Sequence, residues 1–243
     1  MKTTLYLSLP ALLSLFFCSD FSMHGFETHL LCRIFTVTEN GLMMRHEYLY
    51  DENSFPIMHF TYSNDTIESS ETFQYNVIGK IGRIEKTVDV SGPPTHTIQY
   101  SYYLIRYGDD GLMERSDCYL KTDTRYELRS FTTFLYDRFG RIIKSTLYTP
   151  DSTIAAASDF TYDQSGNIIT MDSLRFEYDD KTNPFFFFNL PEVTPRHSSR
   201  NNITRWIYPD SSTYEIHYEY DETGYPLKSF ENNVESIYDY FGR

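Results

Sequence analysis

The segment that decides the fold is Phe134-Leu-Tyr-Asp-Arg-Phe-Gly-Arg-Ile-Ile143. Phe134 and Tyr136 are two residues apart, so their side chains lie on the same face of an extended strand. Asp137 favours a turn, because its carboxylate can accept hydrogen bonds from the backbone N–H groups just ahead. Gly140 can take the positive φ that closes a short loop. The segment therefore predicts a β-hairpin, with the isoleucine pair starting the returning strand.

The same pattern recurs along the chain. Tyr-Asp occurs six times, and four of these pairs are followed by Gly three residues after the Asp. Two degenerate copies surround Tyr75 and Tyr107. The apolar residue two positions before the Tyr and the Gly after it recur together with the pair, so chance repetition in a tyrosine-rich chain does not explain them. The six pairs are Tyr50-Asp51, Tyr136-Asp137, Tyr162-Asp163, Tyr178-Asp179, Tyr220-Asp221 and Tyr238-Asp239, and the four glycines are Gly140, Gly166, Gly224 and Gly242.

These units predict the fold class. Each unit of roughly 25 residues holds two strands, so about seven units predict an all-β, antiparallel meander of roughly 12 to 14 strands. We expect one repeat-built domain over residues 30–243, which either closes into a barrel-like sheet or forms a curled open sheet. No window predicts a long helix; residues 146–159, with Pro150 and three consecutive alanines, predict a loop or a bulged strand edge.

The composition agrees with a sheet protein. The 243 residues include 22 Tyr, 19 Phe and one Trp, and Tyr and Phe favour pleated sheets. The formal net charge is −13, whereas binding to nucleic-acid phosphates requires clustered Lys and Arg. We therefore expect no nucleic-acid partner.

The N-terminus has the form of an export signal. Lys2 precedes an apolar run over residues 5–17, which as a helix is too short to cross a hydrocarbon core of ~30 Å. Cys18 follows and resembles the lipid-acceptor cysteine of bacterial lipoproteins, although the residue before it is a phenylalanine rather than a small residue. We predict an export signal over residues 1–18, with Cys18 as the candidate lipid attachment site, and a linker over residues 19–29. A buried N-terminal helix is the alternative.

One long irregular segment interrupts the pattern at residues 182–202. It contains three prolines and the four consecutive phenylalanines Phe185 to Phe188. Four adjacent side chains cannot all face one side of a strand. We expect this insertion to cover or plug the sheet, with the phenylalanines anchoring it.

Four blocks late in the chain resemble a known family. In order, they are Tyr178-Asp-Asp-Lys-Thr-Asn-Pro-Phe185, Asn201-Asn-Ile-Thr204, Tyr208-Pro-Asp-Ser-Ser212 and Tyr218-Glu-Tyr-Asp-Glu-Thr-Gly-Tyr-Pro226. The family is a secreted one of Gram-negative gut bacteria, of unknown function and with a porin-like β fold. This sequence departs from it at Asp210-Ser211, where the family has Asp-Gly. The resemblance implies a porin-like, barrel-like sheet and an exported location, and it implies no activity.

The strand centres argue against a barrel embedded in a membrane. Reading back from Tyr136 along its own face gives Phe134, Thr132 and Ser130, and the opposite faces of other strands carry charges such as Arg106. A strand that faces lipid needs an unbroken apolar band, and a Lys or Arg at the midplane costs ~2–4 kcal/mol. We expect a soluble barrel or curled sheet, attached to a membrane only through an N-terminal lipid. An outer-membrane barrel is the alternative.

The search for catalytic and metal sites is mostly negative. The seven histidines form no zinc-hydrolase pattern, and the sequence has no nucleophile elbow, phosphate-binding loop or dinucleotide motif. We therefore expect no cofactor, no metal and no enzymatic activity. The pairs Asp109-Asp110 and Asp179-Asp180 could serve a secreted, carboxylate-based hydrolase, which is the alternative, but their place in the pattern makes them turn formers first. Cys32 and Cys118 could form a disulfide in an oxidising compartment.

The aromatic residues suggest a function. Exposed rings can stack on sugars, although aromatic side chains more often fill a sheet interior. The candidate ligand-binding residues are Trp206, which is the only tryptophan, Tyr208, and Phe185 and Phe187 of the insertion. We predict an exported, non-enzymatic binding or structural protein of the periplasm, the outer-membrane surface or the cell exterior. Its expected partner is a glycan or another component of the cell envelope.

Overall fold

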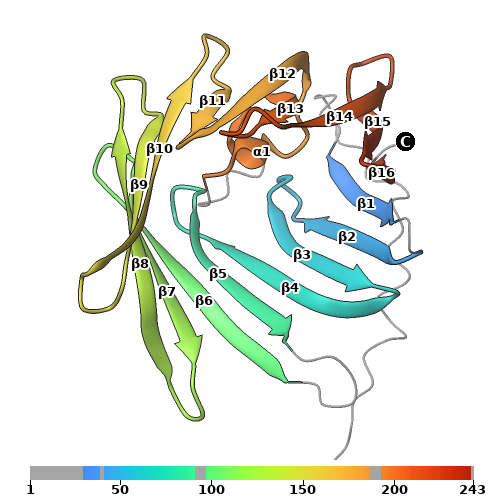
Figure 1. The fold of residues 1–243 in the computed structure, drawn as a ribbon. Coiled ribbons are helices and arrows are strands. Elements are labelled where there is room, and N and C mark those ends of the chain that lie inside the picture. Colours follow the sequence, from blue (N-terminus) through green and yellow to red (C-terminus); the bar gives the residue numbers. More distant parts are fainter. Residues whose placement is uncertain (1–29, 39–40, 91–96, 187–192, 242–243) are drawn as a thin grey trace, which may run out of the picture.

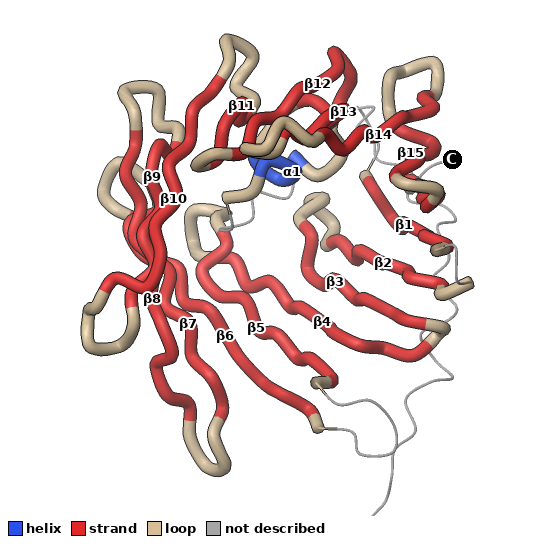
Figure 2. The backbone as a smooth tube through the Cα atoms, in the orientation of Figure 1, coloured by secondary structure: helices blue, strands red, loops and turns tan. Residues whose placement is uncertain are grey.

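The computed structural model describes residues 30–38, 41–90, 97–186 and 193–241. Within these ranges, each strand is antiparallel to its neighbours around a closed barrel (Figures 1 and 2). The strands are β1 (Leu31–Val37), β2 (Met43–Tyr50), β3 (Pro56–Ser63), β4 (Thr66–Tyr75), β5 (Ile81–Asp89), β6 (Ile98–Tyr107), β7 (Met113–Lys121), β8 (Tyr126–Tyr136), β9 (Ile142–Tyr148), β10 (Ile154–Tyr162), β11 (Ile168–Met171), β12 (Leu174–Thr182), β13 (Asn201–Ile207), β14 (Thr213–Tyr220), β15 (Pro226–Glu231) and β16 (Val234–Tyr240). The all-β antiparallel meander is confirmed, and it closes into a barrel.

The described residues form sixteen strands, more than the roughly 12 to 14 that the turn pattern predicted. Six hairpin turns and the connection between β12 and β13 account for β2 to β15. The remaining two strands, β1 and β16, lie at the ends of this series and pair with each other from Leu31 to Val37. This pairing closes the barrel and removes the two free sheet edges.

The hairpin turns at one end of the barrel share one geometry. Gly140 and Gly166 have φ values of 76° and 92°. Asp137 Oδ1 accepts hydrogen bonds from the backbone N–H groups of Phe139 at 2.8 Å and Arg141 at 3.0 Å. Two backbone–backbone hydrogen bonds also close each turn: the first residue donates its N–H to the carbonyl of the fifth, and the fourth donates to the carbonyl of the first. These turns are at residues 51–55, 76–80, 108–112, 137–141, 163–167 and 221–225. We call this end of the barrel the Tyr-Asp rim.

Tyrosine hydroxyls tie most strands that end at this rim to a backbone carbonyl of an earlier strand. Tyr136 Oη donates to the backbone carbonyl of Met113 at 2.7 Å, and Met113 stands six residues after Tyr107. Equivalent hydrogen bonds join Tyr50 to Leu31, Tyr75 to Pro56, Tyr107 to Ile81, Tyr162 to Ile142, Tyr178 to Ile168 and Tyr240 to Pro226. The rim tyrosines therefore satisfy backbone carbonyls in addition to filling the interior.

Two Tyr-Asp pairs lie inside strands, so their interpretation as turns is wrong. Tyr178-Asp179 belongs to β12 and Tyr238-Asp239 to β16. Asp179 Oδ1 accepts from the backbone N–H groups of Lys181 at 2.9 Å and Asn202 at 3.1 Å. Asp179 therefore ties β12 to β13 instead of forming a turn.

The structure also decides the predictions for the alanine run and for the cysteine pair. The alanine run of residues 155–157 belongs to β10, which has a register shift between Ile154 and Ala156, as a bulged strand edge requires. Cys118, on β7, is a free thiol, so the disulfide with Cys32 is not formed. Partial burial raises the pKa of the Cys118 thiol.

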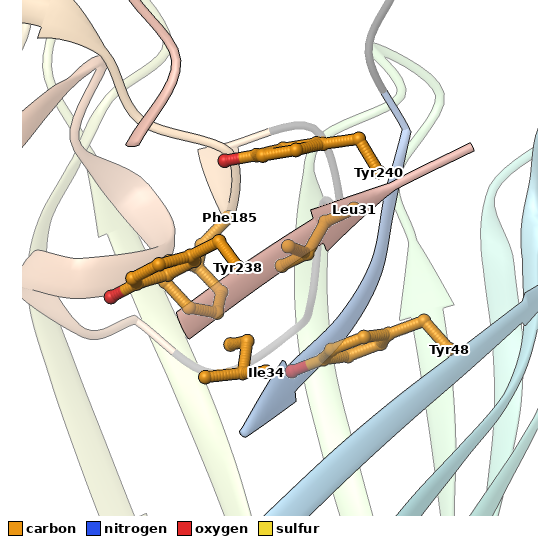
Figure 3. Close-up of a cluster of buried hydrophobic side chains, with 6 residues drawn as sticks. All are labelled: Leu31, Ile34, Tyr48, Phe185, Tyr238 and Tyr240. Carbon is orange, nitrogen blue, oxygen red and sulfur yellow. The ribbon is translucent and has the colours of Figure 1, made fainter. Parts of the chain in front are cut away.

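Apolar side chains pack on the inside of the barrel in three clusters. The closing cluster joins β1, β2 and β16 to the insertion (Figure 3) and consists of Leu31, Ile34, Tyr48, Phe185, Tyr238 and Tyr240. A second cluster surrounds Phe73 and Ile105, and a third surrounds Phe160 and Phe176. The barrel is thus held from inside at several places rather than by one continuous core.

The insertion contains the single helix of the described ranges, α1 (Pro195–Ser198). Pro195 occupies the first turn, where a missing N–H costs nothing, and Thr194 Oγ1 accepts from the backbone N–H of His197 at 3.2 Å. The helix lies inside the barrel opening, beside β11 and β13 (Figures 1 and 2). No helix in the described part of the chain is long and apolar enough to span a bilayer.

Candidate ligand site in the barrel interior

The structure does not bring the four predicted ligand-binding residues together. Trp206 is half-buried on β13 and packs edge-on against Phe176, with ring centroids 5.1 Å apart. Phe185 is buried in the closing cluster, and Tyr208 lies in the exposed turn after β13. Phe187 and the candidate lipid site Cys18 lie outside the described residues.

A chain of polar side chains crosses the inner wall from β5 to β2. Lys86 Nζ donates to Glu71 Oε1 at 2.8 Å, and His59 Nδ1 donates to Glu71 Oε2 at 3.0 Å. On the far side, His59 Nε2 lies 3.1 Å from His46 Nδ1. These residues come from four neighbouring strands, and direct pairing of His59 with Glu71 and of Glu71 with Lys86 places them on one face. That face is the inner one, because Tyr48 of the closing cluster stacks on His59 at 4.6 Å.

The environment fixes the charge of two of these groups. Burial opposes ionisation of Glu71, but the hydrogen bonds and charges of His59 and Lys86 outweigh it and lower the pKa to about 2. Burial, helped by the charges of His59 and Arg196, lowers the pKa of His46 to about 4. At neutral pH, the inner wall therefore holds an ionised carboxylate and, on the other side of His59, an uncharged His46.

A cavity of about 320 Å³ lies against this wall. Three aromatic side chains, Phe73, Tyr103 and Phe134, contribute ring surface to its lining. Glu71 and four hydroxyl side chains supply polar atoms, the hydroxyls being those of Ser116, Thr132, Ser145 and Thr194. Thr194 precedes α1, so the insertion forms part of the cavity wall. The cavity combines flat apolar surface with several hydrogen-bonding groups.

Arg196, from α1, extends into the same interior. It keeps a large exposed surface, yet burial is the largest influence on its pKa, followed by Tyr238 on β16 and Tyr218 on β14. Solvent reaches the Arg196 side chain, and residues from different sides of the barrel surround it, so the side chain lies in the barrel lumen. Burial disfavours its charge, but the surrounding groups outweigh burial and raise the pKa, so Arg196 stays charged.

The site provides binding groups more readily than catalytic ones. Glu71 stays ionised because two donors hold its carboxylate, so it has no proton to give as a general acid at neutral pH. No group of three or more His, Cys, Asp or Glu in the described ranges could hold a metal ion. The arrangement can accept hydrogen bonds at Glu71, donate them from Arg196, and stack rings on an apolar face.

Sequence reasoning missed most of this site, although one signal was present. Alternation along β4 places Glu71 on the face of Phe73 and Tyr75, which is the inward face. A charged residue at that position has to be paired if it is buried, so it marks an unusual point of the wall. Its partners on β3 and β5 follow only from the strand register.

Comparisons with known proteins identify the fold. No family model matches the sequence, and no curated protein matches it. Among solved structures, a porin-like protein from Bacteroides uniformis has a TM-score of 0.57 at 13% identity, covering 87% of this chain and 97% of that one. A porin-like protein from Bacteroides vulgatus has a TM-score of 0.46 at 14% identity, covering 89% and 100%. The Tc holotoxin pore of Photorhabdus luminescens has a TM-score of 0.25 at 12% identity, covering 86% of this chain and 15% of that one. The first of these structures shows that the chain has a porin-like barrel fold.

Proposed function

We propose that this barrel is an exported, non-enzymatic binding protein that takes a small glycan in its interior. The observation that carries the proposal is the cavity of about 320 Å³ with aromatic, hydroxyl and carboxylate groups in its lining. This volume lies at the lower end of the ~300–1,000 Å³ that is typical of small-molecule sites. It suits a ligand of one or two sugar rings.

The chemistry of the lining matches a sugar. A pyranose ring has an apolar face that stacks on aromatic side chains, and Phe73, Tyr103 and Phe134 offer such surface. Sugar hydroxyls both donate and accept, so they need acceptors such as Glu71 and two-way partners such as Thr132. Because the barrel holds these groups in place before binding, little ordering opposes the association.

The outer wall supports a barrel that faces water. Arg205, on β13, lies 2.9 Å from carboxylate oxygens of Glu177 on β12 and of Glu215 on β14. These residues stand on the face opposite Phe176 and Trp206, which point inward. Three charges at a strand centre would be costly against lipid. With the signal-like N-terminus, this supports a location in the periplasm or on the cell surface, with Cys18 as the proposed lipid anchor.

A hydrolase remains the competing function. It needs two carboxyl groups about 5–9.5 Å apart across the scissile bond. Asp110 instead accepts from the backbone N–H of Leu112 at 2.9 Å in a rim turn, and Glu71 is held ionised. These contacts support a binding role over a catalytic one.

The test is calorimetric titration of the full chain with glucose, galactose, cellobiose and lactose. We expect at least one sugar to bind, and Thr132→Trp, which fills the cavity, to abolish binding. Leu135→Trp is the matched control, because Leu135 is 59% exposed on the outer face of the same strand. Equal binding by the two variants, or no binding to the wild type, would reject the interior sugar site. Release of cleaved sugar from cellobiose or lactose would favour the hydrolase.

A further inference from the structure

Arg196 is the feature of the interior that a neutral sugar does not explain. Its guanidinium makes no hydrogen bond and no ion pair with any described residue, and it lies over the Phe185 ring, whose centroid is 5.1 Å from Cζ. A guanidinium has five N–H donors and no acceptor. Because the side chain keeps a large exposed surface, water completes these donors until a ligand replaces it.

The position of Arg196 is fixed by the backbone of the insertion. Asn183 Nδ2 donates to the Arg196 carbonyl at 2.5 Å and to the Ser199 carbonyl at 2.7 Å. Pro195 and the Thr194 cap hold the first turn of α1. The side chain is therefore presented to the lumen from an ordered base, as a ligand-binding group has to be.

The groups around the guanidinium are mostly uncharged. Burial raises the pKa of Tyr48 and of Tyr218, so both phenols stay protonated at neutral pH. Burial, together with the charge of Arg196, lowers the pKa of His197 to about 4, so no second cation repels an anion there. The nearby acid is Glu231 on β15; it accepts a hydrogen bond from Tyr214 and makes no ion pair with Arg196 in the described structure.

We infer that Arg196 binds an oxyanion on the ligand, namely a carboxylate, phosphate or sulfate group. A planar guanidinium pairs with such groups through two parallel hydrogen bonds, and the protonated Tyr218 can add a third. The identity of the ligand as an acidic sugar rests on the proposed function, whereas the oxyanion site itself rests on Arg196 alone. The stacking surface near Glu71 and the cation of α1 then recognise different parts of one ligand.

The experiment compares glucose, glucuronate, glucose 6-phosphate and inorganic phosphate by calorimetric titration of the full chain. We expect the wild type to bind glucuronate or glucose 6-phosphate roughly 10- to 100-fold tighter than glucose, the range expected for hydrogen bonds to a charged group. Arg196→Met should remove this preference, so that the acids bind no more tightly than glucose does to the same variant. Arg200→Met is the matched control, because Arg200 lies four residues further along, with its guanidinium over the Phe186 ring, and it should keep the preference.

The outcomes separate the two proposals. Equal affinity of the wild type for glucose and its acids, or an unchanged preference in Arg196→Met, overturns the oxyanion site while leaving the sugar site intact. Phosphate binding that depends on Arg196, without binding of any sugar, supports the oxyanion site and rejects the sugar. No binding of any probe rejects both. If Arg196→Met does not fold, Arg196→Lys replaces it, because lysine keeps the charge but cannot form the bidentate hydrogen bonds. Arg196→Lys should weaken the preference several-fold. An undiminished preference in this variant also overturns the inference.

Discussion

Around the Tyr-Asp rim, the same side chains meet the same atoms in one turn after another, whereas on the inner wall the charged side chains occur once each. Tyr136 and Tyr162 donate to backbone carbonyls at equivalent positions. Glu71, by contrast, pairs with His59 and Lys86 in a combination that the described residues contain once.

The difference separates positions that build the fold from positions that do something else. Recurring residues at the rim have the same structural role in every hairpin, so their repetition is explained by the barrel. The single charges of the lumen have no role in the hairpins, and burying a charge there costs free energy. The inner wall is therefore the place to look for function, and the rim is the place to look for stability.

Acidification should have the largest effect, and it acts on the inner wall. Burial lowers the pKa of His46 and of His197 from 6.5 to about 4, in surroundings formed by Arg196, His59 and Glu71. Between these pH values the unfolded chain binds more protons than the folded one. Each histidine therefore contributes stability that is complete above pH 6.5 and lost as the pH falls towards 4, about 2–4 kcal/mol for each.

Urea unfolding at pH 7.5, 6.0, 5.0 and 4.5 measures this loss. Glu71, with its pKa lowered from 4.5 to about 2, adds to this loss only at the low end of the window and below it. His46→Gln should remove about half of the pH dependence. The interpretation fails if this variant and the wild type lose stability in parallel.

Removing one charge from the inner wall should rank second. Glu71→Gln leaves Lys86 without its counter-charge and His59 with a weaker acceptor, so we expect a loss of about 2–3 kcal/mol in the free energy of unfolding at pH 7.5. Glu85→Gln on the outer face is the control. Glu85 pairs with Arg83 and is 48% exposed, so its loss should be below about 0.5 kcal/mol. Equal urea midpoints for the two variants would show that charges on the inner and outer faces of the barrel contribute equally to stability.

At the rim, the largest effect should come from a glycine with positive φ. Gly166 has a φ of +92°, and a β-branched residue is strained there, so Gly166→Val should cost about 1–3 kcal/mol. Gly82→Val is the control, since Gly82 has no positive φ and a Cβ there would meet its nearest neighbour at 3.6 Å, an ordinary contact. A shift of the urea midpoint in Gly82→Val as large as in Gly166→Val would show that backbone conformation is not the cause.

The hydroxyl ties between hairpins should follow. Tyr162→Phe leaves the Ile142 carbonyl without its 2.7 Å hydrogen bond, and we expect a loss of about 1–2 kcal/mol. Tyr126→Phe is the comparison, because Tyr126 is 44% exposed at the opposite end of the barrel. Thermal unfolding of both variants decides whether the rim hydroxyls stabilise the barrel; a smaller effect of Tyr162→Phe than of Tyr126→Phe would count against it.

The smallest effect should come from the turn carboxylates. Asp163 accepts from the backbone N–H of Asn167 at 2.8 Å and from its side-chain amide at 2.9 Å, so Asp163→Ala should cost about 1 kcal/mol. In the opposite turn, Asp65 has a φ of 63°, which Asn also tolerates, and its side chain is 77% exposed. Asp65→Asn should then change the stability by less than about 0.5 kcal/mol. If Asp65→Asn lowers the urea midpoint more than Asp163→Ala does, the carboxylates of the rim turns do not stabilise the barrel more than those of the opposite turns.

The Tyr-Asp pattern predicted a large part of the fold because its parts lie close together in the chain. The aromatic residues, the Asp and the Gly of a hairpin fall within about ten residues, and the backbone rules that connect them are local. The pattern misled at Tyr178-Asp179, where the same two residues sit inside β12. It also misled at Tyr238-Asp239, which lies inside β16 although Gly242 follows, so a motif this short does not by itself distinguish a turn from a strand.

The candidate site was largely out of reach of sequence analysis. The sequence indicates Trp206 and Phe185 as aromatic residues in unusual surroundings, whereas the structure places them in different clusters. No feature of the sequence marks Arg196, because a basic residue in an irregular segment is normally solvated. Its role depends on α1 lying inside the barrel (Figure 1), and no periodicity of the sequence encodes that.

The sequence by itself determined the strand alternation, the rim turns and the antiparallel order, since each follows from contacts between near neighbours. Only the tertiary structure decided that β1 meets β16, where Arg33 binds Asp239 across 206 residues of chain. It also decided that the insertion lies in the lumen, where Arg196 is surrounded by tyrosines of β2, β14 and β16. The physical reason is that closure depends on the number and stagger of all the strands together, and the contents of the lumen depend on closure.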